Sequence, residues 1–173
     1  MSTPPRQPAA DPAPGSPDVT ADGMPRARIR VRPRYGEVDS MGVVYHANYL
    51  AYFDMGRTEV MRQRGLPYAE LERRGFQLVV MEVGVRYRRP ARYDEELELV
   101  SWVARVRHAT VLFEYELFGP DGELLVTGFT KLGCLGSDGK PSPLPDEALE
   151  ILGGRPARGG SGSPAAPPSS EEP

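Results

Sequence analysis

The sequence predicts an α+β fold in which a mostly antiparallel sheet of about five strands curls around one long helix. The first observation is the order of the elements, because a strand and two helices are followed by four strand-like segments without a further long helix. The second is strand length. The longest segments would extend about 40 Å at about 3.3 Å per residue, and one long sheet beside one long helix indicates a sheet wrapped around that helix.

The first expected strand covers residues 28–35, where apolar and basic side chains alternate. One face carries Ile29, Val31 and Tyr35, while the arginines between them point the other way, which is the pattern of a half-buried strand. Pro33 has no N–H to donate to a sheet, so we expect it at the end of the strand, at an edge or at a bulge.

A long helix is expected over residues 47–64, and a shorter one over 68–74. The apolar stripe of the long helix repeats at three- and four-residue spacing and is made of Tyr49, Tyr52, Phe53, Gly56 and Val60. Glycine inside a helix costs about 1 kcal/mol relative to alanine, so a neighbouring element should pack closely against the backbone at Gly56. Gly65 and Gly75 would end the two helices in the left-handed conformation.

Four strands are expected over residues 76–88, 95–107, 109–118 and 123–136. In the first of these, the residues predicted to share one face are Val79, Met81, Val83, Val85 and Tyr87. In the second, the apolar parity changes between Leu99 and Val100, which indicates a β-bulge, or burial of the outer face as well, in part by a second subunit. The GPDG turn at 119–122 joins the last two strands as a hairpin, and a helical turn is expected over 145–152.

The two ends of the chain differ in composition from its middle. Residues 1–24 and 153–173 hold 11 of the 19 prolines and no aromatic residue, so we expect disordered tails on either side of one domain over residues 25–152. That domain carries 18 basic and 19 acidic residues, a balance that argues against a nucleic-acid partner. The single cysteine, Cys134, indicates a reducing compartment, and no apolar segment is long enough for membrane insertion, so a cytoplasmic location is expected.

The stretch EVDSMGVVYHANYLAYF at 37–53 brings together an acid, a glycine and the start of the long helix. Helix N-termini offer unpaired N–H groups and a dipole that favours negative charge, so a carbonyl oxygen that becomes an oxyanion can bind there. An ionised Asp39 beside it could attack that carbonyl or activate water, while Gly42 lets the backbone approach a ligand closely. From spacing alone, however, an acid before a helix is more often a capping or turn residue.

The segment D-S-M-G-V-V-Y-H-A-N-Y at 39–49 resembles the signature D-x-x-G-[IV]-V-[YW]-[HY]-x-x-Y of the 4-hydroxybenzoyl-CoA thioesterase family of hotdog-fold proteins. Within that family it is most similar to the acyl-CoA thioesterases associated with the Tol-Pal system. The likeness continues through R-T-E at 57–59 and V-x-Y-x-x-P-A-R-Y-D at 85–94, and it covers residues 28–152. The resemblance implies a hotdog fold and hydrolysis of an acyl-CoA thioester to a carboxylic acid and CoA.

The resemblance also implies roles for the residues that match. Asp39 corresponds to the catalytic aspartate, as nucleophile or general base, and the His46 N–H would polarise the thioester carbonyl. The His46 side chain is either a proton-transfer group or a polar partner at a subunit interface. The residues that would contact the substrate are Gly42, Val43, Val44 and Tyr45.

CoA carries phosphates, so the mouth of the site needs cations. The candidates lie before Pro90 or at the turn into the strand 109–118, and they are Arg88, Arg89, Arg105, Arg107 and His108. The alternative to CoA binding, for each of them, is a solvated charge at the end of a strand. Arg57 and Glu59 are expected to form an ion pair on the helix. No metal or cofactor is expected, because the CoA thioester is the substrate and two isolated histidines offer no ligand set.

Hotdog subunits usually pair with the site between them, so the resemblance implies a homodimer or homotetramer that binds an acyl-CoA. Two other functions stay open. A non-catalytic acyl-thioester binder would use the same pocket, and a hotdog hydratase or dehydratase would add or remove water. The intact Asp39 and the thioesterase-like loop favour hydrolysis over both.

Overall fold

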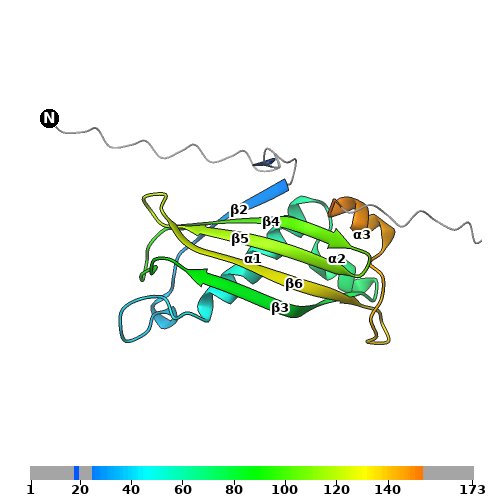
Figure 1. Cartoon of the computed structure of the whole chain (residues 1–173), viewed down its shortest axis with the longest axis horizontal. Helices are drawn as coiled ribbons and strands as arrows, with labels where there is room; N and C mark the ends of the chain where they lie inside the picture. The colour runs from blue at the N-terminus through cyan, green and yellow to red at the C-terminus, as the bar shows by residue number, and fades with distance from the viewer. Residues whose placement is uncertain (1–17, 20–24, 154–173) are drawn as a thin grey trace, which may run out of the picture.

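The computed structural model describes residues 18–19 and 25–153. In chain order its elements are β1 (Asp18–Val19), β2 (Pro25–Val31), η1 (Tyr35–Glu37), α1 (Asn48–Gln63), α2 (Tyr68–Arg73), β3 (Gln77–Tyr87), β4 (Leu97–Arg107), β5 (Thr110–Phe118), β6 (Leu124–Leu135) and α3 (Asp146–Ile151). The sheet order is β1-β2-β4-β5-β6-β3, with every neighbouring pair antiparallel. Figure 1 shows α1 lying along one face of this sheet. The predicted α+β hotdog fold is confirmed, and the two-residue β1 adds a short strand beside β2.

The core lies between α1 and the inner face of the sheet. β5 shows the alternation most clearly, since its buried residues are Val111, Phe113, Tyr115 and Leu117. The Phe53 ring of α1 stacks on the Tyr115 ring with 4.3 Å between the centroids. The predicted apolar stripe of the helix is buried as expected. The N-terminus of α1 lies at the end of the sheet where β3 finishes, and the Tyr87 hydroxyl of β3 contacts the His46 carbonyl there (Figure 1).

Gly56 marks a close approach of α1 to the sheet. A Cβ atom added to this residue would lie 2.1 Å from Ser101 Oγ and 2.8 Å from Leu99 Cδ2, both on β4. A larger residue would therefore displace either the helix or the strand. The close packing predicted at Gly56 is confirmed, and it fixes how deeply α1 sits against β4.

β2 ends earlier than predicted, at Val31 rather than at residue 35. Its ladder with β4 stops at the pair Val31–Leu97, because Pro33 has no N–H with which to continue it. The chain then turns into η1. The expectation that Tyr35 shares the inner face of the strand is wrong, since its side chain is 79% exposed and meets the Tyr93 ring edge-on.

β3 carries a β-bulge around Met81, where its register with β6 shifts. Val79 pairs with Gly133 before the bulge, and Val83 pairs with Thr130 after it. Side chains alternate along β6, so these two partners point to opposite faces of the sheet. The single apolar face predicted for β3 is therefore wrong. The bulge leaves Val79 and Met81 on the outer face and Val83 on the inner one.

β4 has a second bulge, between Val103 and Arg105. A bulge is one of two explanations for the change of apolar parity, but this one lies beyond Leu99 and Val100, so burial on both faces explains that change instead. Val106 consequently pairs with Val111 on the inner face. Val100 stays on the outer face, where it is only 1% exposed, so side chains of this same chain cover it rather than a second subunit.

The helix ends follow the glycine signals, because Gly65 and Gly75 both have a φ of 82° after α1 and α2. α3 lies within the segment predicted to form a helical turn. Inside the segments predicted to be disordered, β1 pairs with β2 and Gly153 lies in a turn. The other residues of those segments lie outside the described ranges, so the tails and the domain limits stay predictions. Within the described ranges, no helix is long and apolar enough to cross a membrane.

Candidate active site

The loop between β2 and α1 folds into a short hairpin. Val38 and Val44 form an isolated antiparallel bridge, and the Asp39 N–H donates to the Val43 carbonyl at 2.9 Å. A turn closes the hairpin, with the Gly42 N–H donating to the Asp39 carbonyl at 2.9 Å. Gly42 has a φ of 72°, and a Cβ added to it would meet nothing within 4 Å. Glycine is therefore needed for the backbone conformation of this turn, not for packing within the chain.

The Asp39 carboxylate is half-buried in this hairpin. Its Oδ1 accepts a hydrogen bond from the Met41 N–H at 2.8 Å, which is the contact of an Asx turn. Its Oδ2 has no hydrogen-bond partner among the described residues. The turn role and the catalytic role are therefore compatible, because one oxygen stabilises the loop while the other remains available for chemistry.

Glu37 joins the start of the hairpin to α1. Its main-chain carbonyl accepts from the Tyr45 N–H at 2.9 Å and from Asn48 Nδ2 at 2.7 Å, while its carboxylate accepts from the Tyr52 hydroxyl at 2.7 Å. Burial acts to raise the pKa of Glu37, but hydrogen bonds from the Arg34 N–H and the Tyr52 hydroxyl outweigh it and lower that pKa. Burial, and then the bond to Glu37, raises the pKa of Tyr52. At neutral pH the pair is thus an ionised carboxylate and a neutral phenol.

The backbone N–H groups of the two residues just before α1 are left unpaired among the described residues. The Tyr45 carbonyl accepts from the Asn48 N–H at 2.9 Å, and the His46 carbonyl accepts from the Tyr87 hydroxyl at 2.8 Å. The N–H groups of His46 and Ala47 have no acceptor in the part of the chain that the structure describes. They directly precede the first helical residue, where the helix dipole favours negative charge. Such a pair of donors suits an oxyanion.

Asp39 lies close to this helix start. The Glu37 carbonyl, two residues before Asp39, accepts from the Tyr45 N–H and from Asn48 Nδ2 of the first residue of α1. The Tyr49 hydroxyl accepts from the Ala91 N–H at 3.2 Å, and the Ala91 carbonyl accepts from the Val44 N–H at 2.8 Å. The hairpin, the first turn of α1 and the segment after β3 therefore form one connected unit around Asp39.

The structure places Asp39 and the other predicted residues of this loop together, and their roles stay predictions. Val43 is half-buried and Tyr45 is 46% exposed, whereas Val44 is 4% exposed and packs in the core. The exposed His46 ring contacts the Tyr45 ring at 4.3 Å between centroids. An acyl group would therefore meet Val43 and Tyr45 more directly than Val44.

The predicted CoA-binding residues fall at opposite ends of the sheet. Arg88 and Arg89 follow β3 at the end that holds the loop, and their N–H groups donate to the Leu125 carbonyl at 2.8 and 3.1 Å. The remaining three, Arg105, Arg107 and His108, lie at the β4–β5 turn at the far end.

The strand register gives the separation between these two groups. Arg107 is level with Val79 of β3, through the successive pairs Arg107–Thr110, Thr110–Gly133 and Gly133–Val79. Tyr87, which contacts the loop, lies eight residues further along β3. The bulge takes up one of these residues, so along β6 the two levels are seven residues apart, or about 23 Å at about 3.3 Å per residue. One chain alone therefore does not gather all five basic residues around Asp39.

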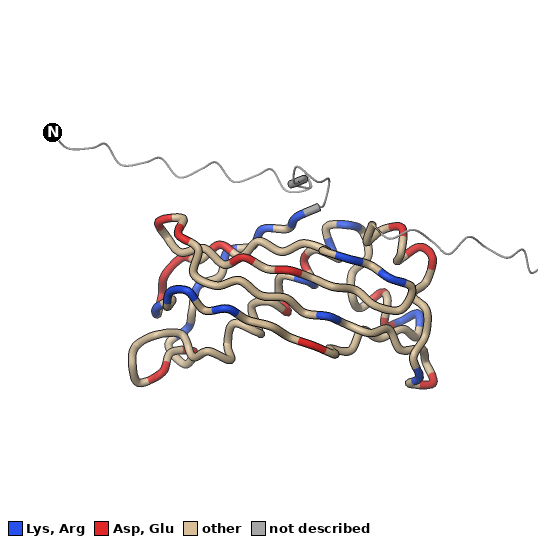
Figure 2. The backbone as a smooth tube through the Cα atoms, viewed as in Figure 1, with Lys and Arg blue, Asp and Glu red and all other residues tan. Residues whose placement is uncertain are grey.

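A groove of about 590 Å³ lies on the outer face beside the far group. The residues that line it include Met81, Arg105, Arg107, Leu112, Phe129 and Lys131. Figure 2 shows basic positions on β4 and β6 toward this end of the sheet. Lys131, which the sequence did not single out, thus joins two of the predicted cations, and the carboxylates of Glu82 and Glu114 line the same groove.

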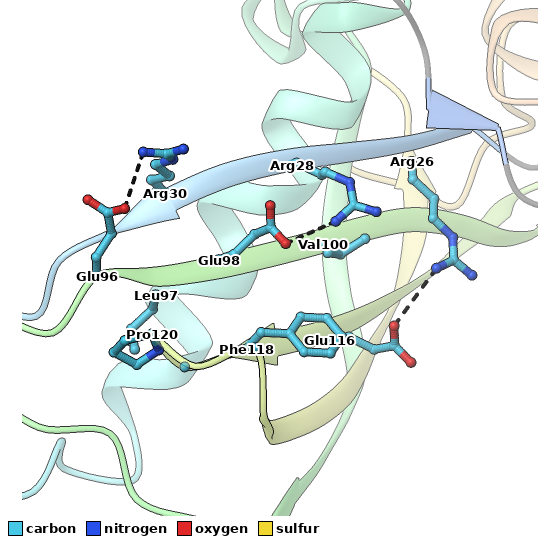
Figure 3. A pocket seen from close by; sticks show the side chains of 12 residues that line it. Arg26, Arg28, Arg30, Glu96, Leu97, Glu98, Val100, Glu116, Phe118 and Pro120 are labelled. Carbon is cyan, nitrogen blue, oxygen red and sulfur yellow. Dashed lines mark hydrogen bonds and ion pairs between the residues drawn. The ribbon is translucent and has the colours of Figure 1, made fainter. Parts of the chain in front are cut away.

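The arginines of β2 form ion pairs on the outer face of the sheet. Three ion pairs run from β2 at 3.8, 2.9 and 3.2 Å: Arg26–Glu116, Arg28–Glu98 and Arg30–Glu96. They border a groove of about 460 Å³ on the outer face (Figure 3). Exposed pairs of this kind contribute about 0–1 kcal/mol each. Because its carboxylates are paired with arginines and it lies on the outer face of the sheet, opposite α1, this groove is not the candidate active site.

The predicted ion pair between Arg57 and Glu59 is wrong. Arg57 Nε donates to Asp54 Oδ1 at 2.6 Å, and Glu59 pairs with Arg62 instead. Residues two apart on a helix point in different directions, whereas residues three apart are neighbours. The Arg57 guanidinium is largely buried and lies 5.2 Å from the centroid of the Tyr68 ring, so it contributes to the packing between α1 and α2.

Cys134 is a buried residue of β6, and burial raises the pKa of its thiol, which disfavours a thiolate nucleophile. Over the described ranges, no group of three or more His, Cys, Asp or Glu side chains is placed to hold a metal ion. The expectation of no metal and no cofactor stays a prediction.

Sequence reasoning missed the tyrosines that hold the loop. Tyr49 and Tyr52 belong to the apolar stripe of α1, and Tyr87 to the apolar pattern of β3, so periodicity predicts only burial for them. Each instead bonds through its hydroxyl to the loop or to the segment beside it. The available signal was tyrosine in place of phenylalanine, because a buried hydroxyl needs a partner.

A hotdog sheet, an acid-bearing hairpin and unpaired amides at the start of the long helix define a hotdog-fold protein with a candidate thioester site. Residues 33–152 match the model of the thioesterase-like superfamily, and the chain belongs to that family. The resemblance seen in the sequence is confirmed at this level, while the narrower 4-hydroxybenzoyl-CoA family and the Tol-Pal association stay predictions.

Individual relatives support the same assignment. The chain is 31% identical over 119 residues to the acyl-CoA thioester hydrolase YbgC of Escherichia coli O6:H1, covering 68% of this chain and 89% of the relative. It is 34% identical over 115 residues to the acyl-CoA thioesterase YbgC of Haemophilus influenzae, covering 66% and 83%. Among solved structures, the DHNA-CoA thioesterase from Staphylococcus aureus matches with a TM-score of 0.66 and 31% identity, covering 71% of this chain and 82% of that one.

Proposed function

We propose that this protein hydrolyses an acyl-CoA thioester to a carboxylic acid and CoA. The observation that carries the proposal is the combination of the available Asp39 Oδ2 with two unpaired N–H groups at the start of α1. The relatives named as acyl-CoA thioesterases support it. The motif at 39–49 further favours membership of the 4-hydroxybenzoyl-CoA thioesterase family and a likeness to its Tol-Pal-associated enzymes. We place the reaction in the cytoplasm, which the lone Cys134 supports.

In the proposed reaction, the thioester carbonyl oxygen accepts hydrogen bonds from the His46 and Ala47 N–H groups. Asp39 Oδ2 then either attacks the carbonyl carbon or takes a proton from a water that attacks it. Either attack gives a tetrahedral oxyanion, which the amides and the helix dipole stabilise, and the collapse of that oxyanion expels CoA as its thiolate. On the nucleophilic route an acyl–Asp39 anhydride remains, and water hydrolyses it to the acid. The two routes are alternatives that share the same residues.

The other loop residues complete the proposed site. Gly42, Val43 and Tyr45 border the acyl group, with Val44 behind them in the core. The His46 side chain, which is exposed beside the Tyr45 ring, either transfers a proton or serves as a polar partner at a subunit interface.

We further propose that the enzyme is a homodimer, or a tetramer of two such dimers. β3 is the last strand of the sheet, so one of its edges has no neighbouring strand among the described residues. The strand exposes an apolar series, Val79, Val80, Met81, Val83 and Tyr87. An unpaired apolar edge is a template for pairing with another strand. Antiparallel pairing of two β3 edges would join two sheets into one.

This pairing would bring the separated basic residues to one site. Antiparallel β3 strands place the Val79 end of one copy beside the Tyr87 end of the other. The β4–β5 turn of a second copy, with its Arg105, Arg107 and His108, would then approach the Asp39 loop of the first. One subunit would act on the thioester while the other binds the phosphates of the same CoA.

A thiol-release screen of the full chain tests the proposal. The panel contains short, long and aromatic acyl-CoAs and an acyl carrier protein thioester, with the acid product identified by mass spectrometry. We expect release of one thiol per acid from at least one class. Acyl-CoA binding at about one per site without release would instead indicate a binding protein, and addition of water to an enoyl-CoA without release would indicate a hydratase. Either result would reject the proposal.

A further inference from the structure

Tyr87, the last residue of β3, contacts the helix start from outside the loop. Its hydroxyl donates to the His46 carbonyl at 2.8 Å, and its ring meets the Tyr49 ring at 5.4 Å between centroids and 66° between planes. Burial raises the pKa of Tyr87, so the phenol keeps its proton and remains a donor at neutral pH. No other donor to the His46 carbonyl is found in the described ranges.

The hydrogen bonds of the two peptide units before α1 come from different elements. The carbonyl of Tyr45 and the N–H of His46 belong to one planar unit, which the Asn48 N–H holds from inside α1 at 2.9 Å. The carbonyl of His46 and the N–H of Ala47 belong to the next unit, which the Tyr87 hydroxyl holds from β3. Within the described ranges, the Tyr87 hydroxyl is therefore the one hydrogen-bond partner of the unit that carries the Ala47 N–H, while the units on either side are held from inside α1, by the Asn48 and Leu50 N–H groups.

We propose that Tyr87 is a positioning residue for thioester hydrolysis, which fixes the 46–47 peptide unit so that the Ala47 N–H joins the His46 N–H as a donor to the oxyanion. This inference rests on the proposed thioesterase function. Donors that are oriented before the reaction stabilise the developing charge without paying for reorientation, and removal of one such donor has a large effect on kcat. Tyr87 itself touches neither the acid nor the reacting carbon in this arrangement, since it acts through the His46 carbonyl.

The Tyr87→Phe variant tests the inference, because it keeps the ring contact with Tyr49 and removes only the hydroxyl. We expect kcat to fall by about tenfold, which corresponds to about 1.4 kcal/mol, with KM within about twofold of the wild-type value. Tyr93→Phe is the matched control. Tyr93 is 53% exposed and makes an edge contact with Tyr35, and we expect its variant to keep both kcat and KM.

A second variant separates positioning from general loss of stability. Tyr49→Phe also removes a hydroxyl from this cluster, but that hydroxyl bonds to the Ala91 N–H and not to the 46–47 unit. We expect Tyr49→Phe to lower the thermal midpoint at least as much as Tyr87→Phe does, and to lower kcat less. If kcat falls in proportion to the midpoint in both variants, Tyr87 is only structural and the inference is overturned.

The remaining outcomes are equally distinct. An unchanged kcat in Tyr87→Phe, or a raised KM with an unchanged kcat, overturns the positioning role while the wild-type turnover leaves the proposed function intact. A wild-type protein that releases no thiol from any acyl thioester overturns the proposed function itself. The positioning inference is supported only when wild-type turnover is present and Tyr87→Phe lowers kcat selectively.

Discussion

The side-chain amide of Asn48 donates to the main-chain carbonyl of Glu37 at 2.7 Å, which ties the first residue of α1 to the start of the hairpin that carries Asp39. The Tyr45 N–H donates to the same carbonyl at 2.9 Å, so the two ends of the hairpin meet at Glu37. α1 thus holds the start of the hairpin through Asn48, and β3 holds the segment after it through the Tyr87 hydroxyl and the His46 carbonyl, so the position of Asp39 depends on side chains outside the hairpin.

Replacement of Asn48 should loosen this attachment. We expect Asn48→Ala to lower the free energy of unfolding by about 1 kcal/mol, the usual contribution of one hydrogen bond, and to lower kcat several-fold. Urea unfolding and thiol release measure the two effects. Gln63→Ala is the control, because Gln63 makes a similar but exposed contact with Glu59 at the other end of α1. Equal effects of the two substitutions would contradict the role of Asn48.

The lowered pKa of Glu37 predicts that the free energy of unfolding depends on pH in the acidic range. A carboxyl whose folded-state pKa lies below its ordinary value of 4.5 stabilises the fold when ionised, and this contribution is lost as the pH falls from that value through the folded-state pKa. We therefore expect wild type to exceed Glu37→Gln in unfolding free energy at pH 7, and the difference to shrink below pH 4.5. Urea unfolding of both proteins across this range measures it. A difference that is independent of pH would count against the contribution of the ionised carboxylate.

The close approach of Gly56 to Ser101 predicts that alanine at position 56 destabilises the protein, although alanine usually stabilises a helix. Alanine favours a helix over glycine by about 1 kcal/mol, yet the added Cβ would lie 2.1 Å from Ser101 Oγ. Overpacking of this kind costs about 1–3 kcal/mol, so Gly56→Ala should lower the thermal midpoint. Ser101 Oγ is buried without a partner among the described residues, so Ser101→Ala should cost little and should partly restore the midpoint in the double variant. Additive effects in this cycle would show that the two positions do not touch.

The exposed edge of β3 predicts that a substitution which prevents pairing of two copies also lowers turnover. We expect Val80→Lys, a charge placed on this edge, to shift the protein toward monomer and to lower turnover at least about tenfold, because the site would lose the basic turn of the second copy. Analytical ultracentrifugation and thiol release measure both. Met55→Lys, at an exposed apolar position of α1, should change neither. A Val80→Lys variant that keeps the wild-type mass would refute pairing through this edge.

Periodicity predicted the parts of the fold that repeat, and it failed where a single residue breaks the repeat. The helix stripe, the close approach at Gly56 and the order of the elements along the chain follow directly from spacing. The bulge at Met81 could not be read from β3, because one extra residue reverses every later side chain while the apolar pattern looks continuous. Tyr35 shows the same limit, since alternation continues past the point where Pro33 ends the ladder.

The candidate site likewise contains some residues that the sequence reveals and others that only the fold reveals. Asp39, Gly42 and His46 stand out because they lie together in one short segment whose motif is specific. Tyr87 could not be found in that way, because it is 41 residues from His46 in the sequence and meets it only through the fold. The separation of Arg88 from Arg107 likewise depends on strand register, which a single sequence does not give.

The most direct test of the account is the turnover of Asp39→Asn beside that of Asp138→Asn. Asp138 is a matched control, because its Oδ1 accepts a backbone N–H two residues ahead, from Lys140 at 3.0 Å, as that of Asp39 does from Met41 at 2.8 Å. Asparagine preserves this turn contact in both variants and removes the charge. We predict that Asp39→Asn lowers kcat by at least about 100-fold with an unchanged thermal midpoint, while Asp138→Asn keeps wild-type turnover. Full activity in Asp39→Asn would contradict the central claim.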